Sequence, residues 1–305
     1  MSLLSLLKPN GKNGFGYAST AEEVTANLDL KGKNILITGC NSGLGQETAR
    51  VLALRGARIL GTARSVEKAD GALIDFGSVH KGYACDLSEP KSVYSCVAAL
   101  KKDGIKIDAI ICNAGIMALP KLQKSHGYEL QFFTNHIGHF ILVTGILELL
   151  SDEGRVVMLS SAAHTAAPKV GIEFDNLSGD ENYRPWRAYG QSKLANLLFA
   201  KELSRRLAGT KKTANAVHPG VIKTNLSRHM PAVANAAFAA IGPLFLKSVA
   251  QGAATQCYVA VHPDVAGISG EYFADVNIAK PRSDADDAAM AKKLWQVSEE
   301  IVGLL

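Results

Sequence analysis

Hydrophobic and polar positions alternate along this chain in two patterns. Short apolar runs rich in Val and Ile, without a polar face, predict strands that are buried on both sides. Between them lie longer stretches in which apolar residues recur with the period of a helix. We expect strands at Asn34–Thr38, Arg58–Thr62, His80–Ala84, Ala109–Cys112, Arg155–Leu159, Asn215–Val217 and Glu271–Phe273. We expect helices at about Leu44–Arg55, Pro90–Asp103, Gln131–Leu150, Arg187–Ala208, Ser248–His262 and Asp284–Val302.

This regular alternation predicts an α/β fold: a single doubly wound Rossmann domain with a parallel, seven-stranded sheet and helices on both faces. No linker rich in Pro or Ser and no internal repeat divides the chain, so we expect one domain over residues 33–305. Residues 1–32 form an N-terminal extension. Ser19-Thr20 followed by Glu22-Glu23 allows a capping box in either register, which predicts a short helix docked ahead of the sheet.

Two long connections, at about residues 162–186 and 220–247, interrupt the alternation. Both leave from the carboxyl end of a predicted strand, where open parallel sheets bind their ligands. We therefore interpret them as substrate loops. Their large apolar residues suggest a lipophilic substrate, although a place in the core is equally compatible with each of them; they are Phe174, Trp186, Met230, Phe238 and Phe245.

The composition is that of an ordinary folded protein, with 47% hydrophobic and 20% charged residues and a net charge of +5. It excludes intrinsic disorder and a disulfide scaffold. Lys and Arg never run longer than two, so no nucleic-acid partner is expected. The most apolar segment, Phe140 to Leu150, is interrupted by Glu148 and predicts no membrane span. The five cysteines lack CxxC spacing, which favours free thiols in the cytoplasm and no metal site.

The first predicted strand runs into Thr38-Gly39-Cys40-Asn41-Ser42-Gly43-Leu44-Gly45 and then into a helix. A glycine-rich turn in this place lets backbone N–H groups approach a pyrophosphate, and the helix dipole favours its negative charge. The GxxxGxG spacing is also compatible with a plain turn. The residues predicted to bind a nucleotide are Gly39, Asn41, Ser42, Gly43, Leu44 and Gly45.

Arg64 ends the second strand, 19 residues after Gly45. Where NAD-binding folds place an acidic residue for the ribose 2′-hydroxyl, an arginine offers a planar cation to a 2′-phosphate. We therefore predict NADP(H) as the cofactor, the alternative being a solvated surface arginine. Asp86, followed by Leu87 after the third strand, is equally placed to accept from the adenine amino group or to cap the next helix.

Tyr189 and Lys193 lie four positions apart in a predicted helix, so the phenol and the ammonium share one face. A neighbouring cation favours the phenolate and is expected to lower the phenol pKa toward working pH, which suits a general acid. Tyr183 and Arg187 have the same spacing at the edge of the preceding loop, so the context decides between the two pairs. Ser161 ends the fifth strand, where its hydroxyl can either donate to a substrate oxygen or cap a turn.

Three further features belong to the pattern. Asn113-Ala114-Gly115 ends the fourth strand with small residues that let a backbone pass close to a ligand. Asn135 is polar in an otherwise apolar helix, where an asparagine is unfavourable unless its side chain has a specific function. For its neighbours His136 and His139 we expect packing or surface roles and not metal binding. Pro219-Gly220 forces a turn after the sixth strand, from which Thr224 can bond a carboxamide.

Taken in this order, these motifs resemble those of the short-chain dehydrogenase/reductase family, and the likeness covers Lys33 to about Val302. Thr134 to Phe140 and Ser192 to Asn196 are similar to its retinol-dehydrogenase-like branch. That branch also contains the oxidoreductase domain of WW-domain proteins and a chloroplast translocon component, and Gly14 to Val24 is most similar to the latter.

The resemblance implies a role for each matching position. Tyr189 would be the catalytic acid/base, and Lys193 would bind the nicotinamide ribose. Ser161 would polarise the substrate carbonyl, and Asn135 would hold a water in a proton relay to Lys193. The remaining positions would bind the cofactor: Gly39, Gly43 and Gly45 at the pyrophosphate, Arg64 at the 2′-phosphate, Asp86 at the adenine and Thr224 at the carboxamide.

We therefore expect an NADP(H)-dependent oxidoreductase that transfers a hydride between nicotinamide and a lipophilic carbonyl or alcohol, as a monomer or homodimer. One alternative is an NADP(H)-binding sensor or scaffold with little turnover, in line with the resemblance of the N-terminal segment. Another is a nucleotide-sugar epimerase or dehydratase, which shares the Tyr-x3-Lys pair but normally shows TGxxGxxG and a larger C-terminal domain.

Overall fold

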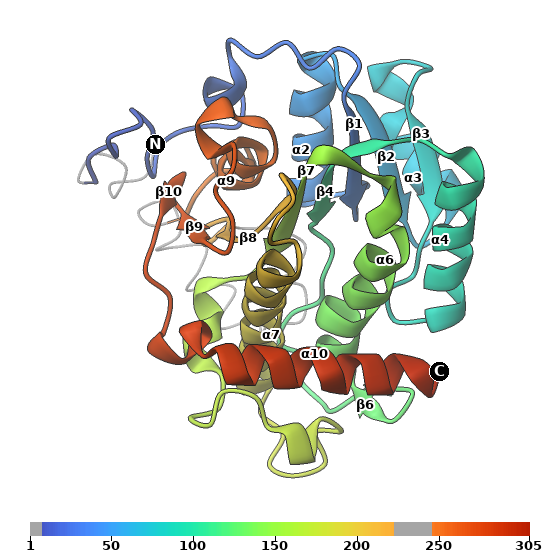
Figure 1. Ribbon diagram of the computed structural model, residues 1–305, viewed down its shortest axis with the longest axis vertical. Coiled ribbons are helices and arrows are strands. Elements are labelled where there is room, and N and C mark those ends of the chain that lie inside the picture. The colour runs from blue at the N-terminus through green and yellow to red at the C-terminus, as the bar shows by residue number, and fades with distance from the viewer. Residues whose placement is uncertain (1–7, 223–245) are drawn as a thin grey trace.

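The computed structural model describes residues 8–222 and 246–305, and it shows a central sheet between layers of helices (Figure 1). The strands in spatial order are β10 (Asn277–Ile278), β9 (Tyr272–Ala274), β8 (Thr213–His218), β7 (Leu150–Leu159), β4 (Ile107–Cys112), β1 (Asn34–Thr38), β2 (Arg58–Ala63) and β3 (Lys81–Ala84). From β3 to β9 all neighbours pair in parallel. The strand order reverses between β1 and β4, and at such a point diverging loops leave a crevice at the carboxyl ends of the strands.

The sheet confirms the expected α/β architecture but has one strand more than the seven predicted. The additional strand, β10, is antiparallel to β9. A tight turn joins the two, with left-handed φ angles of 51° at Asp275 and 65° at Val276. A strand of two residues is too short for a hydrophobic period, so the sequence pattern that predicts β9 contains no sign of β10.

Helices cover both faces of the sheet (Figure 1). They are α2 (Gly43–Leu54) and α9 (Val249–Val261) on one face, and α4 (Pro90–Asp103), α6 (Gly138–Ile146) and α7 (Pro185–Arg206) on the other, with α10 (Ala288–Gly303) as a further layer over α7. Trp295 of α10 packs against Phe140 and Phe199, with ring centroids 4.9 and 5.4 Å apart. The five cysteines are buried and free, as expected.

The segment predicted as one helix over Gln131–Leu150 is composite. It consists of α5 (Leu130–Phe132), the π-helix η3 (Phe133–Ile137), α6 and the turn η4 (Leu147–Leu149). The wide π turn inserts a residue into the helical repeat and places Asn135 at its centre. By length and composition the segment Leu130–Leu149 can cross a membrane, but 78% of its most apolar part is buried inside the protein. It is therefore accounted for as a core helix.

The hydrophobic pattern of the sequence does not predict two short elements of the structure. The helix α3 (Val66–Leu73) buries only Ala69 and Leu73, so its apolar repeat is too short to recognise. Ser65 caps it by accepting from the Lys68 N–H. The hairpin of β5 (Lys124–Ser125) and β6 (Tyr128–Glu129) again has strands of two residues.

The segment ahead of β1 is fastened to α9. The short helix expected there is a single 3₁₀ turn, η1 (Glu23–Thr25). The Thr20 N–H donates to the Glu23 carboxylate (2.7 Å), and the Glu23 N–H donates to the Thr20 hydroxyl (3.2 Å). Of the two capping registers, the structure therefore has Thr20 with Glu23. The Ala21 N–H donates to the Ala250 carbonyl of α9 (2.9 Å).

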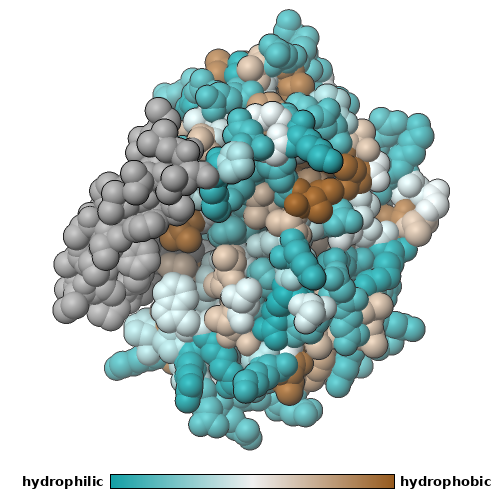
Figure 2. Space-filling view, turned by 90° about the vertical axis from the view of Figure 1, so that its left-hand side faces the viewer, coloured by the Kyte–Doolittle hydropathy of each residue, from teal (hydrophilic) through white to brown (hydrophobic). Residues whose placement is uncertain are grey.

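The face shown in Figure 2 is mostly hydrophilic, with apolar side chains in small groups. The large apolar residues that are exposed come from separate elements, as Leu54 at the end of α2, Ile74 after α3 and Trp186 at the start of α7 show. Single exposed apolar residues are normal on a folded protein.

Candidate functional site

The glycine-rich turn lies at the carboxyl end of β1 and leads into α2. Gly39 and Gly43 have φ angles of 68° and 55°, which favour glycine. A Cβ on Gly45 would lie 2.1 Å from the Gly39 carbonyl oxygen, so the turn is too tight for a side chain there. Ser42 is the N-cap of α2 but makes no side-chain capping bond, which leaves the first amides of the helix open to an anion. The other predicted residues of the turn are exposed or half-buried: Asn41, Ser42 and Leu44.

Asn113-Ala114-Gly115 follows β4 and lies directly beside this turn. Asn113 Nδ2 donates to the Thr38 carbonyl (2.8 Å), and the Ala114 N–H donates to the Thr38 hydroxyl (2.9 Å). A Cβ on Gly39 would lie 3.0 Å from the Ala114 Cβ. The two strand ends are therefore held in close contact at the point where the strand order reverses.

Arg64 directly follows β2 and is exposed at the same edge of the sheet. Within the described part of the chain it has no hydrogen-bond or ion-pair partner. Arg50, by contrast, pairs with Glu22 and Glu47. An unpaired guanidinium in this place is free to bind an anion.

Asp86 does not cap the following helix, so one of its two interpretations is wrong. The N-cap of α4 is Glu89. Asp86 Oδ1 instead accepts from the Ser88 N–H (3.0 Å) and hydroxyl (2.6 Å) in the turn that precedes the helix. Leu87 is buried beneath α6, where a Cβ on Gly138 would lie 2.3 Å from the Leu87 carbonyl oxygen. The adenine contact stays a prediction.

Tyr189 and Lys193 are buried on one face of α7, with 6% and 4% of their surfaces exposed. Lys193 Nζ lies 5.6 Å from the centre of the Tyr189 ring. It donates one hydrogen bond, to the Leu159 carbonyl at the end of β7 (3.0 Å). An ammonium has three hydrogens, so among the described residues two of them remain for a ligand.

The second pair with this spacing has structural partners. The Tyr183 hydroxyl donates to the Leu119 carbonyl (2.7 Å), and Arg187 forms an ion pair with Glu173. Tyr189 and Lys193 thus differ from the second pair in their position, because they lie at the carboxyl end of the sheet.

Burial sets the protonation of the Tyr189–Lys193 pair. It raises the pKa of Tyr189 to about 12, while a hydrogen bond with Ser161 acts in the opposite direction. It lowers the pKa of Lys193 to about 8. The phenol pKa therefore lies above its usual value and not below it as expected, because burial removes the solvation that stabilises the phenolate. At neutral pH the pair is a protonated phenol beside an ammonium, which is the form of a proton donor.

Ser160 and Ser161 directly follow β7 and have different partners. The buried Ser160 hydroxyl donates to the Lys193 carbonyl (2.8 Å). The half-buried Ser161 accepts from the Ala163 N–H (3.1 Å) and also bonds with Tyr189. Ser161 therefore caps a turn and lies beside the phenol. Its hydrogen bond to a substrate oxygen stays a prediction.

Asn135 is fully buried and holds the segment after β4. Its Oδ1 accepts from the Ile116 N–H (2.8 Å), and its Nδ2 donates to the Ile116 carbonyl and to the Ser192 hydroxyl (2.9 Å each). A Cβ on Gly115 would lie 2.9 Å from Asn135 Oδ1 and 3.4 Å from Lys193 Nζ. Asn135 therefore reaches the same space as Lys193. No group of His, Cys, Asp or Glu in residues 8–222 and 246–305 is arranged to hold a metal.

Pro219-Gly220 forms the expected turn after β8. Gly220 has a φ angle of 97°, and a Cβ there would lie 2.6 Å from Lys247 Cδ. His218 Nδ1 accepts from the Ala162 N–H (3.2 Å) and the Gly220 N–H (3.4 Å), which joins this turn to the one after β7. Thr224 lies outside the described residues.

Two residues that support Ser161 were not found from the sequence. His164 Nδ1 bonds to the Ser161 carbonyl (2.6 Å), and its Nε2 accepts from the Arg282 N–H (3.2 Å). The Arg282 guanidinium donates to the carbonyls of His164, Ala167 and Pro168. These partners are 118 positions apart, so no periodicity relates them. The only signal was a lone histidine three residues after Ser161.

The apolar residues proposed for the substrate loops divide into three groups. Trp186 is 46% exposed and its ring stands edge-to-face with Tyr189, 6.1 Å between centroids. Phe174 packs on the core beneath Lys293, whose Nζ lies 4.4 Å from the ring centre. The others lie outside the described residues: Met230, Phe238 and Phe245.

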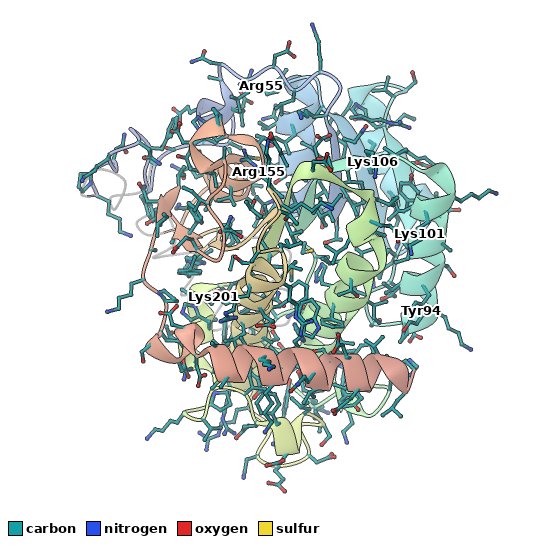
Figure 3. All side chains as sticks on the ribbon, in the orientation of Figure 1. Arg55, Tyr94, Lys101, Lys106, Arg155 and Lys201 are labelled. Carbon is teal, nitrogen blue, oxygen red and sulfur yellow. The ribbon has the colours of Figure 1, made fainter. Side chains whose placement is uncertain are left out.

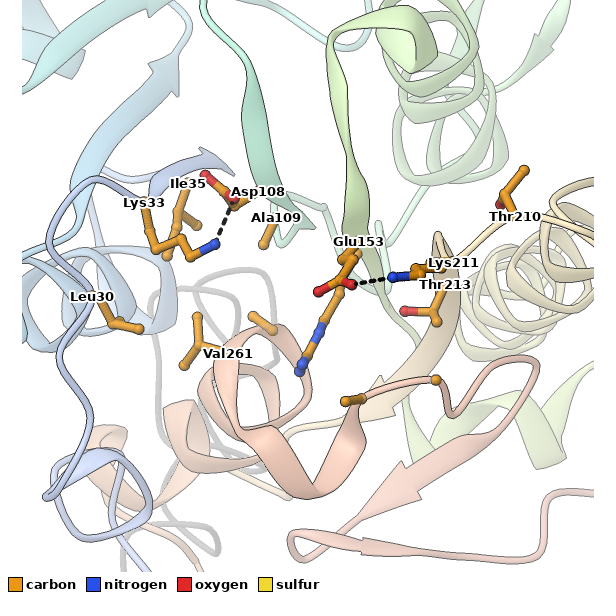
Figure 4. A pocket seen from close by; sticks show the side chains of 14 residues that line it. Leu30, Lys33, Ile35, Asp108, Ala109, Glu153, Thr210, Lys211, Thr213 and Val261 are labelled. Atoms are coloured by element: carbon orange, nitrogen blue, oxygen red, sulfur yellow. Dashed lines mark hydrogen bonds and ion pairs between the residues drawn. The ribbon is translucent and has the colours of Figure 1, made fainter.

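A cavity of about 430 Å³ lies at the opposite edge of the sheet, among the amino ends of β1, β4, β7 and β8. Figure 4 shows Lys33 pointing to Asp108 and Lys211 to Glu153, at 3.0 and 2.9 Å. Arg155, labelled in Figure 3, donates to two carbonyls at the end of α9. These charged groups are engaged with one another or with the backbone, and Tyr189 and Lys193 are not among the residues that line the cavity. The candidate site is therefore the one at the carboxyl edge.

Comparison with known proteins gives a consistent result. The sequence profile of the short chain dehydrogenase family matches residues 33–234. Short-chain dehydrogenase TIC 32 B, chloroplastic, from Brassica napus is 42% identical over 97% of this chain and 96% of that protein. Retinol dehydrogenase 14 from Homo sapiens is 37% identical over 90% of this chain and 88% of its own.

Solved structures share the fold. The crystal structure of an uncharacterised protein from Mycobacterium paratuberculosis has a TM-score of 0.74 and 34% identity, covering 94% of this chain and 98% of its own. A short chain dehydrogenase from Burkholderia cenocepacia in complex with NADP has a TM-score of 0.64 and 24% identity, covering 81% of this chain and 97% of its own.

Proposed function

The chain belongs to the short-chain dehydrogenase family, and we propose that it is an NADP(H)-dependent oxidoreductase that transfers a hydride between nicotinamide and a lipophilic carbonyl or alcohol. The main support is the meeting of the Tyr189 phenol, the Lys193 ammonium and the Ser161 hydroxyl at the carboxyl end of β7. Several relatives are named retinol dehydrogenases, which supports a lipophilic substrate.

The residues at the carboxyl edge suit NADP(H). We assign the pyrophosphate to the amides of the tight glycine turn and the uncapped start of α2. We assign the 2′-phosphate to the exposed Arg64, which has no partner in residues 8–222 and 246–305. The two Lys193 hydrogens that have no acceptor among the described residues are assigned to the nicotinamide ribose. When bound, the cofactor supplies or accepts the hydride. The remaining assignments are to the adenine and nicotinamide ends: Asp86, Leu87, Asn113, Ala114, Gly115, Pro219, Gly220 and Thr224.

The side chains of this protein donate the proton to the substrate and replace it. In the reductive direction Tyr189 donates its phenolic proton to the carbonyl oxygen as negative charge develops there. Ser161 donates a second hydrogen bond to that oxygen and orients the carbonyl. The Lys193 ammonium stabilises the phenolate that remains, and Asn135 holds a water through which the proton is replaced.

The rate of carbonyl reduction is expected to fall as pH rises through about 8. Burial lowers the pKa of Lys193 to about 8, so the ammonium is present below that pH and is lost above it. The pKa of Tyr189 is raised to about 12, so the phenol stays protonated throughout and is not the cause of the fall. The measurement is kcat/KM for NADPH oxidation from about pH 6 to 10.

Lys193→Arg is the control for this pH dependence. Arginine retains its charge over the whole range, although its different shape is expected to lower the rate overall. The variant should show no decline near pH 8. The same decline in wild type and variant would assign the titration to another group.

Trp186→Ala is expected to raise KM for a lipophilic carbonyl about tenfold, since the half-exposed indole lies beside Tyr189. The affinity for NADPH should be unchanged, because Trp186 is not among the residues assigned to the cofactor. Val170→Ala, at an exposed apolar residue of the same loop, is the control. An equal rise of KM for small polar carbonyls would speak against a lipophilic contact at Trp186.

The direct test of the function is NADPH oxidation over a panel of ketones and aldehydes of graded lipophilicity. Turnover that increases with lipophilicity supports the proposal. The resemblance of Gly14 to Val24 to a chloroplast translocon component favours a second candidate, an NADP(H)-binding sensor or scaffold. Co-purification of a stoichiometric partner that NADPH releases, without turnover of any carbonyl, would support this candidate. A cytoplasmic location and a monomer or homodimer remain our proposals.

A further inference from the structure

His139 is a fully buried histidine of α6 whose two ring nitrogens both bond to parts of the candidate site. Nδ1 lies 2.9 Å from the Asn135 carbonyl oxygen, and Nε2 lies 2.9 Å from the Thr38 hydroxyl. The Thr38 oxygen in turn accepts from the Ala114 N–H (2.9 Å). One side chain thus joins the glycine-rich turn, the segment after β4 and the π-helix.

The donor and the acceptor can be assigned in each hydrogen bond of the chain Asn135–His139–Thr38–Ala114. Burial lowers the pKa of His139 to about 4, so the ring is neutral and has one N–H. The Asn135 carbonyl can only accept, which places that N–H on Nδ1. Nε2 then accepts from the Thr38 O–H, whose oxygen accepts from Ala114. Position 139 therefore requires a side chain with a donor toward the Asn135 carbonyl and an acceptor toward the Thr38 hydroxyl.

The charge of Lys193 gives a second reason for a neutral ring. Its field acts on His139 and contributes to the lowered pKa of the imidazole. A permanent cation at position 139 would stand close to the ammonium that we assign to the ribose, and would repel it. A neutral imidazole joins the strand ends without adding charge to the site.

Asn135 is held from two sides. Ile116 and Ser192 bond its side chain, and His139 bonds its carbonyl. Asn135 lies in a π turn, in which the regular helical hydrogen bonds are interrupted, so bonds from outside the backbone repeat set its position. The His139 bond is therefore part of what directs the Asn135 amide toward Gly115 and the space it shares with Lys193.

We propose that His139 is a positioning residue of the reaction, which holds Asn135 and the Thr38–Ala114 contact in the geometry that Lys193 and the cofactor need. The inference rests on the proposed oxidoreductase function. His139 donates no proton to substrate; it acts through Asn135 and Thr38.

The test compares two buried histidines of one helical segment. His139→Leu removes both bonds, and His139→Gln retains an amide N–H and a carbonyl that can restore them. The matched control is His136→Leu, since His136 is also buried but bonds to the Ser298 hydroxyl of α10 (2.9 Å). Each full-length variant is assayed for kcat, KM, NADPH affinity by fluorescence titration, and Tm.

His139→Leu is expected to lower kcat about 10- to 100-fold, as a displaced catalytic geometry does, with KM for the carbonyl changed less than about threefold. NADPH affinity should fall about fivefold, the equivalent of one lost hydrogen bond. His139→Gln should recover most of both losses. His136→Leu should lower Tm about as much but keep kcat and NADPH affinity within about twofold. Equal kcat losses in the two Leu variants, or no recovery with Gln, would overturn the proposal.

Two outcomes need a further comparison. If His139→Leu does not fold, Thr38→Val replaces it, because it removes the hydroxyl and keeps the shape; unchanged NADPH affinity would then overturn the proposal. If the wild-type protein binds NADPH but turns over no carbonyl, the proposed function fails and the His139 inference is decided by NADPH affinity. A loss of about fivefold in His139→Leu, with none in His136→Leu, supports it, and equal affinities overturn it.

Discussion

The Tyr189→Phe variant is expected to lose carbonyl reduction by about 10²- to 10⁴-fold in kcat while it retains its affinity for NADPH. The substitution removes only the phenolic oxygen, which is the proton donor in the proposed reaction. The buried ring keeps its edge-to-face contact with Trp186, so the fold and the cofactor contacts should be unaffected. The measurement is single-turnover NADPH oxidation together with an NADPH titration.

Tyr183→Phe is the matched control. It also removes a phenolic oxygen, from a tyrosine that stands four positions before a cation, but this hydroxyl bonds to the Leu119 carbonyl and to Gln131. We expect a stability loss of about 1 kcal/mol and a kcat within about twofold of the wild type. If the two variants lose activity equally, the assignment of the proton donor to Tyr189 is wrong.

Arg64→Asp is expected to weaken NADPH binding by about 10²-fold and NADH binding by less than about threefold. The exposed guanidinium has no partner among the described residues, so its loss breaks no structural bond. An aspartate in its place repels a 2′-phosphate and can accept from a 2′-hydroxyl. Titration of both cofactors, followed by nicotinamide fluorescence, measures the change of preference.

The control for Arg64→Asp is Lys31→Asp, which changes the net charge by the same amount before β1, at the amino edge of the sheet. It should leave both affinities unchanged at moderate salt, because charges far from the cofactor are screened. Equal losses for NADPH and NADH in Arg64→Asp would contradict the assignment of the 2′-phosphate to this residue.

Local signals explain which elements the sequence predicts well. The bounds of α4, Pro90–Asp103, agree with the prediction because Pro90 stands in the first turn and Gly104 follows with a left-handed φ of 62°. The bounds of β1 agree because an apolar run ends at a glycine turn. Each of these signals lies within a few residues of the feature it marks.

The rest depends on contacts between distant residues. The π turn around Asn135 adds one residue to a helix that is apolar on every side, so the hydrophobic period does not show it. The spacing of Tyr189 and Lys193 predicts that they are neighbours but not how deeply they are buried, and burial reverses the expected direction of the phenol pKa. His139 and Arg282 support the site through partners about 100 positions away, which no local pattern can reveal.

The central claim is that this protein moves a hydride from NADPH to a carbonyl carbon with a proton from Tyr189. The most direct measurement uses NADPH deuterated at nicotinamide C4 with the lipophilic carbonyls of the panel, and mass spectrometry of the products. We expect the wild type, and not Tyr189→Phe, to form an alcohol with one deuterium on the carbinol carbon. Tight binding of NADPH without deuterium in any product would contradict it and would favour an NADP(H)-binding sensor.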